Sequence, residues 1–353
     1  MEFDVVIATR NRASALMMSL PLMLSQTRLP ESLIIVDSSD NHAEVKSAIE
    51  IIFGNYPRAS KVQTRLVHTS PGASLQRNIG LAMVESPVVF FPDDDSLWFP
   101  GVTEAVMRAY EGDKGCRVGA VSMEESATPP IRITSKNVKY KMTTLDRVKS
   151  FYDRHFAKLE ALFPPDPFLT AGRSLAGPGR LLAANMENVG NCSILTGFLM
   201  TFRTDVIRGL SGFDENLGRY SLFEDRDAGL RVLKAHSILY ARSAKVFHYK
   251  SPEYRSSGYE FGVMNVLNRS YIVCKNFEQG SQWRLSLQPF LLSQVLRYGF
   301  RSSSNWGRQR LLGAFRAYCL VSQLLDLTGQ ELVNKYLNLK RECIPSQYSR
   351  GRQ

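Results

Sequence analysis

Three consecutive aspartates, Asp93, Asp94 and Asp95, follow the apolar run VVFF (88–91) in the stretch SPVVFFPDDDSLWFPG. The run is short, β-branched and aromatic and lies between two prolines, which is typical of a buried strand. Adjacent carboxylates repel one another, and burial increases that cost, so we expect a positive partner. A divalent metal is one candidate, because hard cations prefer oxygen ligands. The alternative is that the aspartates cap the helix expected at 100–110 and face solvent.

Two more acidic sites and one histidine need a joint explanation with these aspartates. Asp37 ends the run SLIIVD, Glu224 and Asp225 lie in the stretch FEDRD, and His248 lies in KVFHYKS. Each has a structural explanation when taken alone: Asp37 closes a turn, and Glu224 begins a helix whose dipole favours a carboxylate. Their order along the chain is what favours a shared acidic site.

Predicted strands and helices alternate over the first 123 residues, and these elements must position the acidic residues. Strands are predicted at 4–8, 32–40, 65–70, 88–91 and 118–123, and helices at 14–26, 42–53, 74–84 and 100–110. Such alternation predicts an α/β fold with a mainly parallel sheet covered by helices. Ligands bind at the carboxyl ends of such strands, where ATRN, DSSD and PDDD fall. The absence of GxGxxG and GxxxxGK[ST] motifs argues against a nicotinamide or P-loop protein.

The alternation of strands and helices ends after residue 123. Residues 124–190 contain ATPP, FPPDP and SLAGPG around a charged, helical piece at 145–163, which indicates an inserted subregion of loops and helix. Regular structure resumes at 192–203, and beyond residue 255 the pattern is helical to the end. We therefore expect one α/β domain over 1–255, with 124–190 as its insertion, and a C-terminal helical region over 256–353.

Charge is concentrated in that C-terminal region. The chain has a formal charge of +11, and from residue 281 onward 11 Lys and Arg stand against 3 Asp and Glu. Apolar stripes at helical spacing lie in the same region, and the arginines 308, 310 and 316 interleave with the second one. A basic amphipathic surface suits an anionic membrane, whereas nucleic-acid binding lacks both a recognised motif and serial stacking aromatics. The alternative is that the stripes only pack in the interior.

The cysteines and the apolar runs bear on the compartment. Five scattered cysteines without a CxxC pair signal neither a zinc site nor a disulfide framework and favour a reducing compartment. The N-terminus lacks the pattern of a signal peptide, and no uncharged apolar run is long enough to cross a bilayer. We therefore expect a cytoplasmic protein.

The motifs VVIATRNR, LIIVDSSD, GASLQRNIGLAMVESPVVFFPDDD, GFDENLGRYSLFEDRDAGLRV and VFHYKS occur in this order. In type and order they resemble those of the family-2 inverting glycosyltransferases of the GT-A fold, of the non-processive type that acts on bacterial polysaccharides and glycolipids. The resemblance covers residues 3–123 and 190–275. It implies the nucleotide-diphospho-sugar transferase fold, with the catalytic domain at 1–255.

The resemblance also implies roles for individual residues. Asp225 is similar to the general base of the family, with Glu224 as the alternative. A divalent cation, Mg²⁺ or Mn²⁺, is expected on Asp95, with His248 as a second protein ligand. The residues implied in nucleotide binding are Ala8, Arg10, Asp37 (near the base), Arg77, Asp93 (near the ribose) and Asp94.

The implied activity is transfer of a single sugar from a nucleotide-sugar donor to a hydroxyl of a saccharide, glycolipid or polyprenyl-linked acceptor, as in polysaccharide biosynthesis. The transmembrane helices and QxxRW motif of the processive relatives are missing, since QWRL at 282–285 differs from it. A cytoplasmic enzyme is expected, with peripheral attachment to the inner face of the cell membrane as an extension. The alternatives are a sugar-1-phosphate nucleotidyltransferase, disfavoured because ATRNRAS has no glycine, and an inactive nucleotide-binding scaffold.

Overall fold

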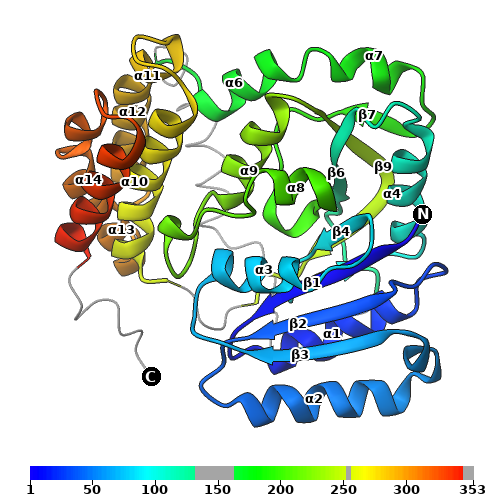
Figure 1. Ribbon diagram of the computed structural model, residues 1–353. Helices are drawn as coiled ribbons and strands as arrows, with labels where there is room; N and C mark the ends of the chain where they lie inside the picture. The colour runs from blue at the N-terminus through cyan, green and yellow to red at the C-terminus, as the bar shows by residue number, and fades with distance from the viewer. Residues whose placement is uncertain (132–162, 252–255, 345–353) are drawn as a thin grey trace. The chain divides into compact units, whose positions relative to one another are not determined.

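The computed structural model describes residues 1–131, 163–251 and 256–344 and falls into two compact units. One unit contains residues 1–131 and 172–255, and the other contains residues 132–171 and 256–353. Figure 1 shows the sheet of the first unit and the helices of the second. The helical piece predicted at 145–163 lies almost wholly outside the described residues.

The first unit is built on one sheet with the strand order β3-β2-β1-β4-β8-β6-β9-β5, and β7 pairs with β9 (Figure 1). The strands are β1 Phe3–Thr9, β2 Ser32–Asp37, β3 Gln63–His68, β4 Val88–Phe91, β5 Ser96–Trp98, β6 Val118–Glu125, β7 Val189–Asn191, β8 Met200–Arg203 and β9 Ser237–His248. Strands β1 to β4 are parallel, and so are β6 and β9. The predicted mainly parallel sheet is confirmed.

Three antiparallel strands complete the sheet. Strand β8 lies between β4 and β6, and both β5 and β7 pair with β9. Of the regular segment predicted at 192–203, the strand covers only Met200–Arg203, after the 3₁₀ turn Gly197–Leu199. The helix expected at 100–110 is α4, which begins at Val102 after Gly101 in the left-handed region (φ +83°). The alternative that Asp93, Asp94 and Asp95 cap this helix is wrong, because β5 lies between them and its first turn.

Helices cover both faces of the sheet, because successive side chains of a buried strand point to opposite faces. Phe3, Val5 and Ile7 of β1 lie in one apolar cluster with residues of α1, α2 and α4. Val6 lies in a second cluster with residues of α3, α8 and α9. The helices of this unit are α1 Ala13–Leu24, α2 His42–Asn55, α3 Ala73–Ala82, α4 Val102–Gly112, α7 Gly179–Ala184, α8 Thr204–Gly209 and α9 Glu224–Leu233, and α6 Pro167–Leu175 spans the unit boundary.

The described residues of the second unit are mainly helical from Gly258 to Cys343, as predicted. Its helices are α10 Gly258–Asn276, α11 Gln282–Leu285, α12 Leu287–Phe300, α13 Asn305–Tyr318 and α14 Gly329–Cys343 (Figure 1). Helix α10 begins with a capping box of Ser257 and Glu260 and is almost wholly buried. It crosses α13 at close range, since a Cβ atom on Gly262 would lie 2.1 Å from the carbonyl oxygen of Arg310. Within the described parts of the chain, none of the helices combines the length and apolarity needed to span a bilayer.

Candidate active site

Several of the predicted site residues lie where β1, β2 and β4 end. Thr9 of β1 is paired with Asp37 of β2, and the acidic turn follows directly after β4. Ala8 is half-buried one residue before the end of β1, and Arg10 just beyond it forms an ion pair with Asp40 at 3.3 Å. This is the carboxyl edge of the parallel strands, the edge expected to bind a ligand.

Strand β5 brings Asp95 to His248. Ser96 pairs with His248 across the antiparallel β5–β9 ladder, so the residue before it lies beside the end of β9. Asp95 Oδ2 accepts a hydrogen bond from the backbone N–H of Ser251 at 2.9 Å, and Oδ1 lies 3.2 Å from His248 Nε2. Burial disfavours ionisation of Asp95, but His248 and the N–H of Ser251 outweigh it and hold its pKa below the usual value.

The donor set of this corner fits a divalent cation. One ligand atom from each of Asp93, Asp95 and His248 lies within 4.8 Å of the others. Asp95 Oδ1 is buried and, among the described residues, has no well-aligned hydrogen bond beyond its 3.2 Å contact with His248 Nε2, so a cation held by both side chains would satisfy it. The ring of His248 stacks on Phe198 with 4.4 Å between centroids, and this contact fixes its orientation. Burial opposes protonation of His248, but Asp95 outweighs burial and raises its pKa.

Asp94 points into the unit. Its carboxylate accepts hydrogen bonds from Thr9 Oγ1 at 2.8 Å and from Arg12 Nη1 at 3.1 Å, while Ser19 Oγ donates to its backbone carbonyl at 2.7 Å. Burial raises the pKa of Asp94 to about 7, although Arg12 opposes the shift. Sequence reasoning did not single out Thr9 or Arg12. The polar run TRNR directly after a buried strand was the available signal.

Arg77 joins the acidic turn to α9. The guanidinium of this buried side chain donates to Glu224 Oε1 at 2.6 Å and to Asp93 Oδ1 at 2.8 Å. Phe213 lies 5.7 Å below it, measured from the guanidinium carbon to the ring centroid. One buried cation therefore holds carboxylates from two motifs that are far apart in the sequence.

Glu224 and Asp225 differ in their partners. Asp225 Oδ2 accepts a hydrogen bond from the backbone N–H of Gly197 at 2.9 Å, and Oδ1 accepts from that of Arg226 at 2.8 Å. Burial raises the pKa of both acids, that of Glu224 to about 8 despite Arg77. Gly197, which sequence reasoning did not single out, thus positions Asp225 through its backbone.

Left-handed backbone gathers in the loops of this site. Asn11 after β1, Ser221 and Phe223 before α9, and Lys250 after β9 have φ values of +52°, +48°, +76° and +56°. Such a conformation costs about 1–3 kcal/mol for a residue other than glycine and persists where neighbouring contacts enforce it. The loops that carry the acidic motifs are therefore held in unusual conformations.

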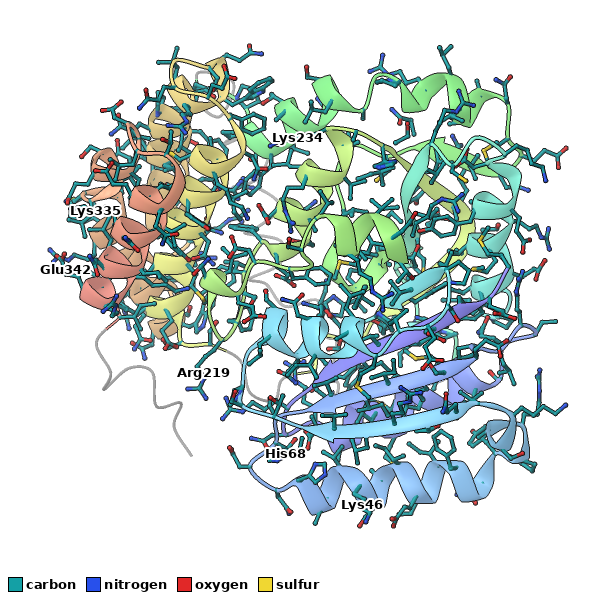
Figure 2. All side chains as sticks on the ribbon, viewed as in Figure 1. Lys46, His68, Arg219, Lys234, Lys335 and Glu342 are labelled. Atoms are coloured by element: carbon teal, nitrogen blue, oxygen red, sulfur yellow. The ribbon has the colours of Figure 1, made fainter. Side chains whose placement is uncertain are left out.

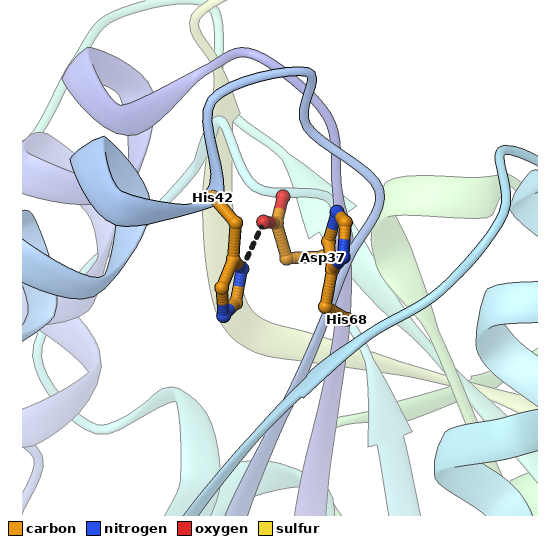
Figure 3. Close-up of side chains that lie close together, drawn as sticks. All are labelled: Asp37, His42 and His68. Carbon is orange, nitrogen blue, oxygen red and sulfur yellow. Dashed lines mark hydrogen bonds and ion pairs between the residues drawn. The ribbon is translucent and has the colours of Figure 1, made fainter.

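Asp37 lies in a separate cluster at the same edge. Figure 3 shows its carboxylate close to the rings of His42 and His68, and His42 Nδ1 lies 2.7 Å from Asp37 Oδ2. The backbone N–H of Ser39 donates to Oδ1 at 2.9 Å, so both oxygens of Asp37 have partners. The ring centroids of His42 and His68 are 4.6 Å apart. The structure thus brings together Asp93, Asp95, His248, Arg77, Glu224 and Asp225, and it places Asp37 with two histidines.

Solved structures resemble this chain in fold. TarS 1-349 of S. aureus in complex with UDP-GlcNAc is 13% identical with a TM-score of 0.53, and 97% of this chain and 91% of that chain are covered. The mannosyltransferase PcManGT of Pyrobaculum calidifontis, in complex with GDP-Man and Mn²⁺, is 14% identical with a TM-score of 0.51, covering 97% and 86%. GalNAc-T7 with UDP, GalNAc and Mn²⁺ is 12% identical with a TM-score of 0.55, covering 92% and 56%.

These likenesses confirm the predicted GT-A fold. No curated protein sequence matches the chain. Residues 4–174, which hold the first strands and the acidic turn, match the model of glycosyl transferase family 2. This match favours sugar transfer over the nucleotidyltransferase alternative. Residues 4–174 are therefore a glycosyl transferase family 2 domain, and the protein is a glycosyltransferase of the GT-A fold.

Proposed function

We propose that residues 1–255 catalyse metal-dependent, inverting transfer of one sugar from a nucleotide-sugar donor to an acceptor hydroxyl. The observation that carries the proposal is the meeting of two acidic motifs at one sheet edge, Asp93 and Asp95 on one side and Glu224 and Asp225 on the other, joined by Arg77. Such a site has a place for a cation and a carboxylate base.

Asp95 and His248 would hold the divalent cation. When bound, the cation would neutralise the negative charge that develops on the departing nucleoside diphosphate. An imidazole beside carboxylates favours Mn²⁺ over Mg²⁺, because Mg²⁺ prefers oxygen ligands and retained waters. The structures of PcManGT and GalNAc-T7 with Mn²⁺ support this choice. Ala8, Arg10, Asp37, Asp93 and Asp94 are proposed to line or support the nucleotide subsite.

Asp225 is the proposed general base. It would take the proton of the acceptor hydroxyl as that oxygen attacks the anomeric carbon, and the bond from that carbon to the phosphate oxygen breaks with its electron pair on the phosphate. Attack opposite to the leaving group inverts the anomeric configuration. Two backbone N–H groups orient the Asp225 carboxylate, whereas Glu224 is bound to Arg77 at 2.6 Å and has a pKa of about 8. An acid that is protonated at neutral pH is the poorer base.

A donor panel that includes UDP-GlcNAc and GDP-Man tests the proposal, with nucleoside diphosphate release measured with Mn²⁺, with Mg²⁺ and with chelator. Asp225→Asn should keep donor affinity but lower turnover by about a hundredfold or more, within the range of acid–base catalysis. Asp205→Asn, at an exposed aspartate of α8, is the matched control. Full activity in chelator, a product of retained configuration, or a dead Glu224→Gln beside a nearly normal Asp225→Asn would each refute the corresponding part.

The acceptor is proposed to be a saccharide, a glycolipid or a polyprenyl-linked sugar of polysaccharide biosynthesis. A lipid-carried acceptor would require the enzyme to work at the inner face of the cell membrane. The basic excess of the C-terminal region supports such a location, since anionic lipids attract arginine and lysine.

A further inference from the structure

Exposed apolar side chains form a continuous surface on α12 and α13. Leu292, Leu296 and Phe300 recur every four residues along α12 and are 37%, 41% and 57% exposed. Leu312 and Phe315 on α13 are 61% and 56% exposed. Residues three or four apart lie on the same side of a helix. We call the surface formed by these five side chains the α12–α13 face.

The exposed side chains are not needed to pack the helices. Leu291 and Val295 of α12 and Ala314 and Ala317 of α13 are buried and hold the two helices in the unit. Between the helices runs a groove lined by Val295, Leu311 and Tyr318 together with four residues of the α12–α13 face and Gly299. Contiguous exposed apolar surface of this kind marks an interaction site.

The charged residues of the segment that carries this face have one sign. Between Glu278 and Asp326 the sequence has six arginines and no carboxylate. Arg284 is bound internally, to the backbone oxygens of Phe277 and Leu325 at 2.7 Å each. Arg308 lies one turn before Leu312 and is exposed.

Arg316 lies one turn after Leu312 and is also exposed. It forms an ion pair at 2.5 Å with Glu342 of α14, a residue labelled in Figure 2. The segment that carries the apolar side chains thus supplies arginines and no carboxylate, and Glu342, which pairs with Arg316, comes from α14. This is the composition of a surface that enters an anionic lipid interface.

We propose that the α12–α13 face docks on an anionic bilayer, with its five apolar side chains in the interface and its arginines against lipid phosphates. The proposal deepens the proposed function by naming how the enzyme would meet a lipid-carried acceptor. A second copy of the chain is a poorer occupant, because a two-fold contact would bring the same arginines face to face. No carboxylate in this segment would neutralise them.

Vesicle cosedimentation of the whole protein tests the proposal. Vesicles of phosphatidylcholine alone are compared with vesicles that also contain phosphatidylglycerol, at low and at high salt. The wild type should bind the anionic vesicles at low salt and dissociate from them at high salt. The double variant Leu312→Gln/Phe315→Gln should lower the partition coefficient about tenfold or more, and Arg308→Gln about fivefold.

Matched controls are available on other helices. Leu181→Gln changes a side chain of α7 that is 77% exposed, and Arg108→Gln changes an exposed arginine of α4. Both should bind within about twofold of the wild type if binding is local to the face. Thermal melts of every variant exclude unfolding as the cause.

Three results would overturn the proposal: no binding to anionic vesicles at low salt, control variants as weak as the face variants, or a self-association in sedimentation equilibrium that the double variant abolishes. Binding does not require turnover, so Asp225→Asn should bind vesicles like the wild type. A protein that binds vesicles but shows no metal-dependent transfer refutes the catalytic proposal alone. A protein that transfers sugar but binds no vesicle refutes only the docking surface.

Discussion

Removal of the Arg77 side chain should destabilise the first unit severely. Arg77 is 5% exposed, and its guanidinium faces Glu224 and Asp93 at 2.6 and 2.8 Å. At pH 9, above the pKa of about 8 of Glu224, Arg77→Met therefore leaves two carboxylates without their cation. Breaking a buried pair by removing one partner costs about 3–5 kcal/mol. A domain of this size loses about 2–4 °C of Tm per kcal/mol. We therefore expect the Tm to fall by roughly 10 °C.

The lysine variant separates charge from geometry. Arg77→Lys keeps the positive charge, but a single ammonium group cannot occupy both positions of the planar fork. Loss of one hydrogen bond to a charged group costs about 1.5–3 kcal/mol. The Tm of Arg77→Lys should therefore lie between those of the wild type and Arg77→Met.

Differential scanning fluorimetry in chelator measures these shifts. Arg65→Met is the matched control, because Arg65 pairs at 3.1 Å with Glu85, whose side chain is 78% exposed. Exposed ion pairs contribute about 0–1 kcal/mol, so the control should lose at most a few degrees. The double variant Arg77→Met/Glu224→Gln lacks one of the two carboxylates that Arg77→Met leaves unpaired, so its Tm should be higher than that of Arg77→Met. Equal Tm losses in Arg77→Met and Arg65→Met would refute the argument that the Arg77 pairs are buried and strong.

Three further changes test other parts of the structure. Asp95→Asn should weaken Mn²⁺ binding at least about tenfold, as measured by electron paramagnetic resonance. Unchanged binding would show that the metal binds at another site. Burial raises the pKa of Glu224 to about 8, so the folded protein holds a proton that the unfolded chain releases near its ordinary pKa. Stability of the metal-free protein should therefore fall as pH rises from about 5 to 8, and Glu224→Gln should flatten that fall in Tm. Gly262→Ala should lower the Tm because its Cβ would meet the backbone oxygen of Arg310 at 2.1 Å, whereas Gly299→Ala, with open space around it, should not.

The sequence predicted the parts of the fold that depend on local pattern. The runs that form β1, β2 and β4 are apolar on both faces, and the structure places each within a residue or a few of the predicted bounds. The acidic turn falls at the carboxyl edge because β4 ends just before Pro92. These features follow from strand burial and from the alternation of elements, which a single sequence displays.

The parts that depend on distant pairing were not predictable in this way. Strand β5 has only three residues, and it exists because it pairs with the end of β9. The position of β8 between β4 and β6 depends on hydrogen bonds that leave no local trace. Arg77 was expected near the nucleotide, but which carboxylates it contacts depends on where α9 meets the acidic turn. The roles of Asp95 and His248 came from a resemblance and not from spacing.

Because Asp95 and His248 meet only through the β5–β9 ladder, formation of the proposed cation site depends on when this ladder forms during folding. Asp95 and Ser251, whose N–H holds the Asp95 carboxylate, are 156 residues apart in the chain. Contacts between such distant residues form late, because the intervening chain must first be ordered. A slip of one residue in the ladder would turn the ligand side chains to the opposite face of the sheet. A growing chain would therefore have no complete set of the proposed cation ligands until β9 has joined in register, so Mn²⁺ binding at this site would report that the last strand of the sheet is in place.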